Sequence, residues 1–208
     1  AKKVYIKAED KAEDSGDLKS LAGSLCNDLG DKEWAKKVCI KAEDKAEDSG
    51  DLRNLAGSLC NDLGDKEWAK KVYIKAEDKA EDFSDFLYLA DSIYGDISDK
   101  EWAKKVYIKA EDKAEDCSDF WSLADSIHKN LGDKEWAKKV YIKAEDNAKN
   151  YDDFILLADS IYEDIEDKGW ATKLYKKVED KAEESSDFRF LADSIHENLG
   201  DKEWATKL

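Results

Sequence analysis

Residues 65–98 read DKEWAKKVYIKAEDKAEDFSDFLYLADSIYGDIS, and this 34-residue unit recurs along the whole chain. Its tryptophan returns every 34 residues without a gap, at Trp34, Trp68, Trp102, Trp136, Trp170 and Trp204. A fixed period of this length is typical of stacked supersecondary units, in which each unit packs on its neighbours. Residues 1–30 and 35–64 differ at only three positions, as recent duplication or a consensus-type design would leave them. The sequence therefore predicts a tandem repeat protein.

Each unit contains two helical patterns joined by a short turn. In the first, apolar residues from Leu18 onward return at helical spacing, and Gly30 follows where a left-handed C-terminal cap is expected. In the second, Asp65 is placed to cap a helix whose apolar face includes Trp68 and Tyr73. Because neither helix can bury its apolar stripe alone, the two must close into a hairpin and stack on neighbouring hairpins. The predicted fold is all-α, an α-solenoid of helix-turn-helix repeats.

The composition agrees with helix throughout and narrows the classes of partner. Of the 208 residues, 41% are charged, none is proline, and the formal net charge is −16. So large a negative charge disfavours nucleic acid and anionic membranes as partners, and it favours basic peptides and proteins or multivalent cations. The same charge could equally serve only to keep a long solenoid soluble.

The unit resembles the tetratricopeptide repeat. The residues that carry the resemblance are Phe86, Leu89, Ala90 and Ile93 in the first helix, Ala103, Tyr107 and Ala110 in the second, and the Gly132-Asp133 turn. Two features depart from the family pattern: the second helix enters one residue late, and Glu-Asp-x-Ser-Asp stands where the family has its closing proline. The resemblance implies a right-handed superhelix whose first helices line the concave surface.

In this phasing the chain is one repeat array, 1–208. The expected repeats are 17–50, 51–84, 85–118, 119–152 and 153–186, flanked by a lone second helix at 1–16 and an incomplete repeat at 187–208. Neither flanking segment has the polar outer face of a capping repeat. We therefore expect the array to continue in a longer chain, or copies to stack head to tail into a filament or rod.

No constellation typical of catalysis occurs in the sequence. The only two histidines, His128 and His196, lie two repeats apart, or about 20 Å if helix layers stack at about 10 Å. The recurring serines have no histidine and carboxylate placed to activate them, and no glycine-rich phosphate loop is present. We expect no enzymatic activity, no cofactor and no metal site.

The four cysteines are expected to be free thiols. Cys26 and Cys60 occupy the same position in adjacent repeats, which places them about 10 Å apart, too far for a disulfide. No Cys-x-x-Cys pair suggests a metal site. Unpaired thiols favour the cytoplasm weakly, whereas a filament would fit an extracellular location, so the compartment stays open.

Positions that vary between repeats indicate a candidate binding groove on one flank of the first helices. They are Lys19, Arg53, Leu87, Trp121, Ile155 and Arg189 in one register, Tyr94, His128, Tyr162 and His196 (after Cys26 and Cys60) in a second, and Asp91, Asp125, Asp159 and Asp193 (after Gly23 and Gly57) between them. The family geometry makes this flank concave. Varied residues on a constant framework are typical of a binding surface, although drift at tolerant positions gives the same pattern. Aromatic residues such as Trp121 favour binding.

The second helices offer a different candidate surface on the convex side. Opposite their buried face lies a row of isoleucines, Ile6, Ile40, Ile74, Ile108 and Ile142, which ends at Lys176. Five apolar side chains in register form a ridge that could make lateral contacts between solenoids. Alternatively, the stems of neighbouring lysines shield it.

Together these features predict a non-catalytic structural and interaction scaffold, an open-ended solenoid that stacks end to end into a filament or is a segment of a longer array. The alternative is a discrete peptide- or protein-binding module, natural or engineered, that uses the varied groove. The expected partners are the chain itself or, for the module, peptide or protein ligands of basic character.

Overall fold

The computed structural model describes residues 2–208, and every regular element of this part of the chain is helical. The α-helices are α1 (Lys2–Lys11), α2 (Ser15–Asn27), α3 (Lys32–Asp44), α4 (Ser49–Asn61), α5 (Lys66–Lys79), α6 (Phe83–Ser92), α7 (Lys100–Lys113), α8 (Cys117–Ser126), α9 (Lys134–Asn147), α10 (Tyr151–Ser160), α11 (Lys168–Glu179), α12 (Ser185–Ser194) and α13 (Lys202–Lys207). Four π-helical segments follow first helices: η1 (Ile93–Ile97), η2 (Ile127–Leu131), η3 (Ile161–Ile165) and η4 (Ile195–Leu199). The all-α prediction is confirmed.

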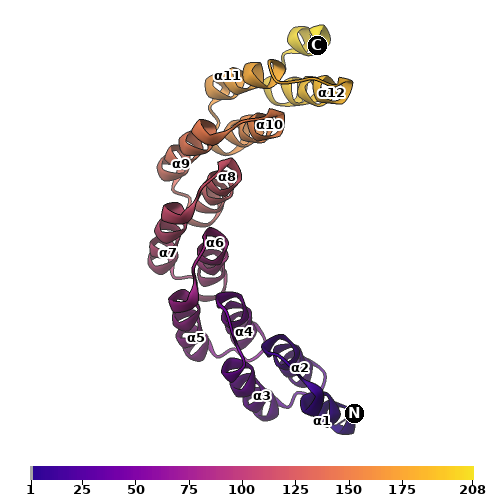
Figure 1. Ribbon diagram of the computed structural model, residues 1–208, viewed down its shortest axis with the longest axis vertical. Helices are drawn as coiled ribbons and strands as arrows, with labels where there is room; N and C mark the ends of the chain where they lie inside the picture. The colour runs from indigo at the N-terminus through magenta and orange to yellow at the C-terminus, as the bar shows by residue number, and fades with distance from the viewer. Residues whose placement is uncertain (1) are drawn as a thin grey trace. The chain divides into compact units, whose positions relative to one another are not determined.

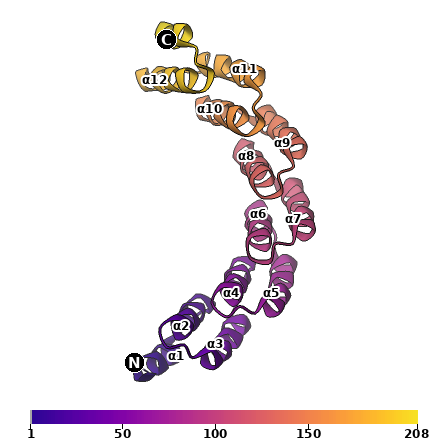
Figure 2. The same cartoon turned by 180° about the vertical axis from the view of Figure 1, so that it is seen from behind.

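The helices form two compact units, residues 1–112 and 113–208, and α7 crosses the boundary between them. In the first unit α2, α4 and α6 form one row, with α3 and α5 in a second row (Figures 1 and 2). In the second unit α8, α10 and α12 form one row, with α9 and α11 in the other. Within each unit a first helix packs along the second helix of its hairpin and on the first helix of the next hairpin. This serial packing is that of an α-solenoid.

The core repeats with the sequence. Leu55 and Ala56 of α4 and Ala69, Val72 and Tyr73 of α5 are all fully buried. The small alanines let the two helices approach closely, and the large tyrosine fills the space between successive hairpins. Equivalent residues are buried in the hairpins α8–α9 and α10–α11. Each hairpin therefore supplies part of a core that its neighbours complete.

Aspartate side chains start both helices of the repeat. Asp65 accepts a hydrogen bond from the backbone N–H of Trp68 at 3.1 Å, as its position in the sequence predicts. Before α6, Asp82 accepts from the N–H of Asp85 at 2.9 Å, and Asp85 in return accepts from the N–H of Glu81 at 3.0 Å. These reciprocal bonds satisfy amides that the first turn leaves without partners. The Glu-Asp-x-Ser-Asp segment therefore caps the first helix of the next hairpin.

The turn inside each hairpin requires a left-handed residue. Glycine takes this conformation at Gly30, Gly64, Gly132 and Gly200, with φ between 65° and 71°. Ser98 and Glu166 occupy the same place in their repeats, with φ of 61° and 59°. Because a Cβ atom is strained at such angles, these two hairpins hold their turn at a cost that the others avoid.

Candidate interaction surfaces

The predicted groove residues differ widely in exposure. Lys19, Arg53, Asp91, Tyr94, Trp121, Asp125, His128, Ile155, Asp159 and Tyr162 are half-buried, Arg189, Asp193 and His196 are exposed, and Leu87 is buried. Leu87 is only 5% exposed and belongs to the core. The helical pattern alone does not predict which of these residues are exposed. A residue beside the buried stripe is exposed or buried depending on whether the neighbouring hairpin covers it.

Two aspartates of the predicted groove, Asp91 and Asp159, accept hydrogen bonds from other helices. Tyr107 donates a 2.5 Å hydrogen bond to Asp91, and Tyr175 donates one of 2.6 Å to Asp159. Asn198 donates to the same Asp159 oxygen at 3.0 Å. Burial raises the pKa of the Asp159 carboxyl group above its usual value, against the effect of these hydrogen bonds. Both carboxylates therefore serve as acceptors between packed helices.

The Tyr and His register lies against the turn that leads to the second helix. Lys100 Nζ, at the start of α7, lies 5.8 Å from the ring centre of Tyr94, and Lys168 Nζ, at the start of α11, lies 5.6 Å from that of Tyr162. His128 Nε2 is 4.0 Å from Asp164. These aromatic rings therefore pack at one end of the hairpin.

The exposed apolar side chains of the first helices belong to a neighbouring register. This register is not part of the groove that variation between the repeats predicts. Tyr88 is 53% exposed, Leu156 38% and Phe190 54%. Arg189 lies over the Phe190 ring at 4.9 Å. The signal was present in the sequence, since this register reads Ser20, Asn54, Tyr88, Ser122, Leu156 and Phe190.

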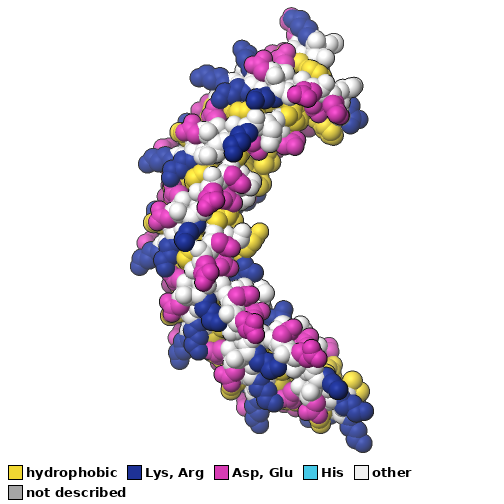
Figure 3. Space-filling view, viewed as in Figure 1, with side chains coloured by type: hydrophobic (Ala, Val, Ile, Leu, Met, Phe, Trp, Pro, Cys, Tyr) yellow, Lys and Arg dark blue, Asp and Glu magenta, His cyan; other side chains and the backbone are white. Residues whose placement is uncertain are grey.

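In the second unit these apolar side chains lie on acidic helices. The segment α10–η3 carries five acidic residues and no basic one: Asp152, Asp153, Asp159, Glu163 and Asp164. The second helix α11 has the opposite character, since it contains four lysines and one acidic residue. Figure 3 shows Lys and Arg side chains gathered along the edges that α3 and α5, and α9 and α11, form in their units. The two rows of helices thus differ in charge as well as in apolar content.

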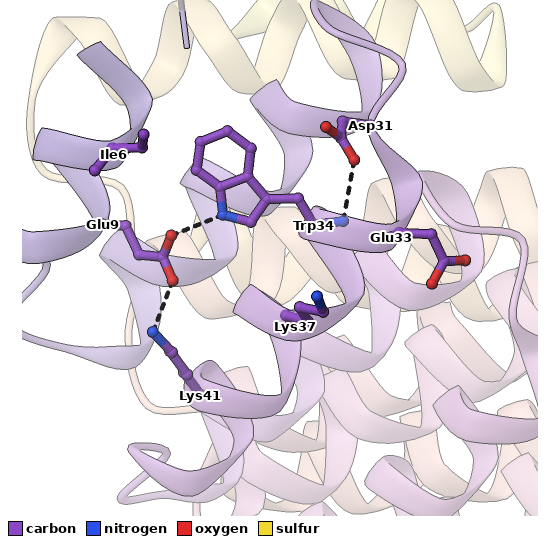
Figure 4. A pocket seen from close by; sticks show the side chains of 7 residues that line it. All are labelled: Ile6, Glu9, Asp31, Glu33, Trp34, Lys37 and Lys41. Carbon is purple, nitrogen blue, oxygen red and sulfur yellow. Dashed lines mark hydrogen bonds and ion pairs between the residues drawn. The ribbon is translucent and has the colours of Figure 1, made fainter. Parts of the chain in front are cut away.

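The isoleucines of the predicted ridge lie on the exposed side of the second helices. Ile6, Ile40, Ile74, Ile108 and Ile142 are 46–53% exposed. Two of them also form one wall of a cleft between consecutive second helices, Ile6 beside Trp34 and Ile142 beside Trp170 (Figure 4 shows the first). The ridge is therefore interrupted by clefts with a tryptophan in each.

Each such cleft contains a three-residue arrangement that we call the Glu–Trp–Lys bridge. Trp34 Nε1 donates a 2.7 Å hydrogen bond to Glu9, and Lys41 Nζ donates another of 2.7 Å to the second oxygen of the same carboxylate (Figure 4). The bond from Lys41 and that from Trp34 hold the pKa of Glu9 below its usual value. The same bridge joins Glu43 with Trp68 and Lys75, Glu77 with Trp102 and Lys109, and Glu145 with Trp170 and Lys177.

The nucleophilic and metal-binding side chains are dispersed. All four cysteines are unpaired and buried, and burial raises the pKa of the Cys39 and Cys117 thiols to about 12. A thiol so rarely ionised is a poor nucleophile. Across residues 2–208, no three His, Cys, Asp or Glu side chains are grouped to hold a metal ion. None of the helices in that range has the length and apolar character needed to span a bilayer.

Comparison with known proteins adds no relative: no protein-family model matches this chain, and no curated protein matches it. The tetratricopeptide assignment therefore remains a resemblance in sequence pattern, and the structure supports the broader statement that the chain is a helical repeat.

Proposed function

We propose that this protein is a non-catalytic interaction scaffold whose second unit binds a basic, partly apolar segment of a partner protein. The binding surface consists of the first helices α10 and α12 with the π-helical turns that follow them. The helical repeat architecture fits a scaffold, since serial hairpins present a long row of surface residues on a stable core.

The observation that carries this proposal is the exposure of Leu156 on the acidic segment α10–η3 and of Phe190 on α12, which contains two aspartates and one arginine. Large apolar side chains on a surface favour association because binding removes them from water. Half-buried Ile155 extends the apolar surface on α10. The surrounding carboxylates attract a basic segment and disfavour an acidic one. A segment that alternates lysine or arginine with apolar residues satisfies both features.

The test uses a short labelled peptide of lysine and leucine, with a peptide of glutamate and leucine as its counterpart. Fluorescence anisotropy should show binding of the basic peptide alone, with an affinity that falls as salt rises. The double variant Leu156→Ala and Phe190→Ala should bind about tenfold more weakly, because it removes both anchors. Ile142→Ala is the matched control, since Ile142 is 47% exposed on a second helix of the same unit. Unchanged affinity in the double variant, or an equal loss in the control, would overturn the proposal.

End-to-end association is a second candidate, favoured by the exposure of α1. Val4 is 69% exposed, whereas its counterparts Val38 and Val72 are fully buried. Val4 and Tyr5 line an open cleft together with Leu21 of α2. This face has the residue types that pack against a first helix in the other hairpins. Either a preceding repeat of a longer chain or a second copy can supply that helix, and we propose the second copy, which builds a rod or filament.

Light scattering across a range of concentrations tests this association. The protein should form species larger than 23.6 kDa that dissociate on dilution. Val4→Lys should abolish them, because it places a charge on the apolar face. Ile6→Lys is the control, since Ile6 is exposed like its counterparts in other repeats. A monomer at every concentration, or equal effects of the two substitutions, contradicts end-to-end association.

A further inference from the structure

The cleft between the second helices α9 and α11 contains a lysine supplied by the chain itself. Lys138 Nζ of α9 lies 3.1 Å from Asp167 Oδ2 and 5.7 Å from the ring centre of Trp170. Its counterpart Lys2 of α1 lies 3.1 Å from Asp31 Oδ2, the equivalent carboxylate. An ammonium group held by a carboxylate beside an indole face combines an ion pair with a cation–π contact. The chain thus shows which chemical group this kind of cleft accepts.

The cleft between α11 and α13 lacks this lysine. Thr172 occupies the position of Lys138, and its hydroxyl donates a 2.7 Å hydrogen bond to the carbonyl of Lys168 in its own helix. The cleft beside Trp204 has a volume of about 700 Å³, against about 380 Å³ for the cleft that contains Lys138. Thr172 is one of the residues that line this cleft, in the position that Lys138 has in the other.

Asp201 lines this cleft as Asp167 lines the cleft that contains Lys138. Asp201 accepts a 3.0 Å bond from the backbone N–H of Trp204, but no lysine among residues 2–208 pairs with it. Glu179 accepts from Trp204 Nε1 at 3.0 Å. Of the two lysines that line the cleft, Lys207 is paired with Glu203 at 2.6 Å. Lys176 stands where other repeats have the exposed isoleucine, at the outer edge of the helix.

We propose that the cleft formed by Trp204, Asp201 and Thr172 binds the ammonium group of a lysine side chain presented by a partner protein. The partner lysine takes the place that Lys138 occupies in its own cleft, with its ammonium at Asp201 and beside the Trp204 ring. This site is on the second helices and is independent of the apolar face of α10 and α12. It recognises a single charged side chain, whereas that face recognises an extended segment.

The test follows the indole N–H signals of the intact chain by NMR during titration with a short glycine peptide that contains one lysine. The Trp204 signal should shift in a saturable manner, and the signal of Trp170, whose cleft already holds Lys138, should not. The same peptide with acetyllysine, which has lost the charge, should leave Trp204 unshifted. Equal shifts with the lysine and acetyllysine peptides would overturn the proposal.

Two substitutions test the role of the resident lysine, one by adding it to the Trp204 cleft and the other by removing it from the Trp170 cleft. Thr172→Lys supplies the missing lysine and should weaken peptide binding at Trp204 at least about tenfold, a difference of about 1.4 kcal/mol. Lys138→Thr removes the resident lysine and should make Trp170 respond to the peptide. The other indole signals report whether each variant stays folded. Undiminished binding in Thr172→Lys, a silent Trp170 in folded Lys138→Thr, or a Trp204 signal that moves with protein concentration alone, as a second copy in the cleft would cause, contradicts the inference.

Discussion

Trp68 Nε1 donates a 2.8 Å hydrogen bond to Glu43, a residue 25 positions earlier in the preceding second helix. The second oxygen of the same carboxylate accepts a 2.6 Å bond from Lys75. The Glu43 side chain is only 16% exposed, so both bonds are partly shielded from water. One carboxylate thereby joins two residues of the next hairpin, and its recurrence makes the Glu–Trp–Lys bridge a regular connection between hairpins.

We expect Glu43→Ala to lower the free energy of unfolding by about 1–2 kcal/mol, because it leaves the Trp68 indole and the Lys75 ammonium without their acceptor. Urea denaturation followed by circular dichroism measures the effect. The neighbouring Asp44 is exposed, and Asp44→Ala should change stability by less than about 0.5 kcal/mol. Equal losses in the two variants would show that the bridge contributes nothing specific.

Substitutions in the register of the buried tyrosine of the second helix should change stability in opposite directions. Tyr73 is fully buried and donates a hydrogen bond to Asp96, so Tyr73→Phe should cost about 1–2 kcal/mol. Cys39 occupies the same register in the preceding repeat, where Asp62 stands in the place of Asp96. Cys39→Tyr should raise the free energy of unfolding by about 1 kcal/mol, because it adds buried apolar surface and the missing hydrogen bond. Thermal and urea unfolding check both signs, and destabilisation by Cys39→Tyr would show that the first repeats pack differently there.

Glycine in the two strained turns should make the protein more stable. Ser98 and Glu166 adopt φ of 61° and 59°, where the other hairpins have glycine. Ser98→Gly should therefore raise the free energy of unfolding by about 0.5–1 kcal/mol, and Glu166→Gly by a similar amount. The reverse change, Gly132→Ser, should lower it by about 1 kcal/mol. A melting temperature that falls in both glycine variants would contradict the strain.

Asp159 should make stability depend on pH in an unusual direction. Burial raises the pKa of its carboxyl group, so the folded state binds that proton more tightly than the unfolded state does. Its contribution is favourable below about pH 4, the ordinary Asp range, and is lost as pH rises through the raised pKa. The stability of Asp159→Asn relative to the parent protein should therefore increase with pH across that window, as urea unfolding at several pH values will show.

The capping residue Asp167 should show the opposite dependence. The hydrogen bond from the Trp170 N–H, with help from Lys138, holds the pKa of Asp167 below its usual value. Its contribution is present above about pH 4 and is lost as pH falls through the lowered pKa. The deficit of Asp167→Asn should accordingly shrink in acid. Parallel pH profiles for Asp159→Asn and Asp167→Asn would contradict both assignments.

Local rules were enough to predict much of the fold. The cap at Asp65, the left-handed Gly30 and the buried face through Tyr73 follow from helix chemistry and were confirmed. The binding surface was harder to predict. Variation between repeats places Leu87 in the groove, but Leu87 is buried; the exposed Phe190 lies in a register outside the predicted groove. Two residues adjacent on a helical wheel differ in this way because the neighbouring hairpin covers one of them.

The sequence by itself therefore determined the repeat, its two helices and their caps, because these depend on residues close together in the chain. Only the tertiary structure decided that Glu43 meets Trp68 and that Lys138 enters the Trp170 cleft while Thr172 leaves the Trp204 cleft open. Such pairings depend on the angle and stagger between helices of successive hairpins. The angle and the stagger are determined by packing over the whole interface, and the apolar pattern of one helix does not encode them.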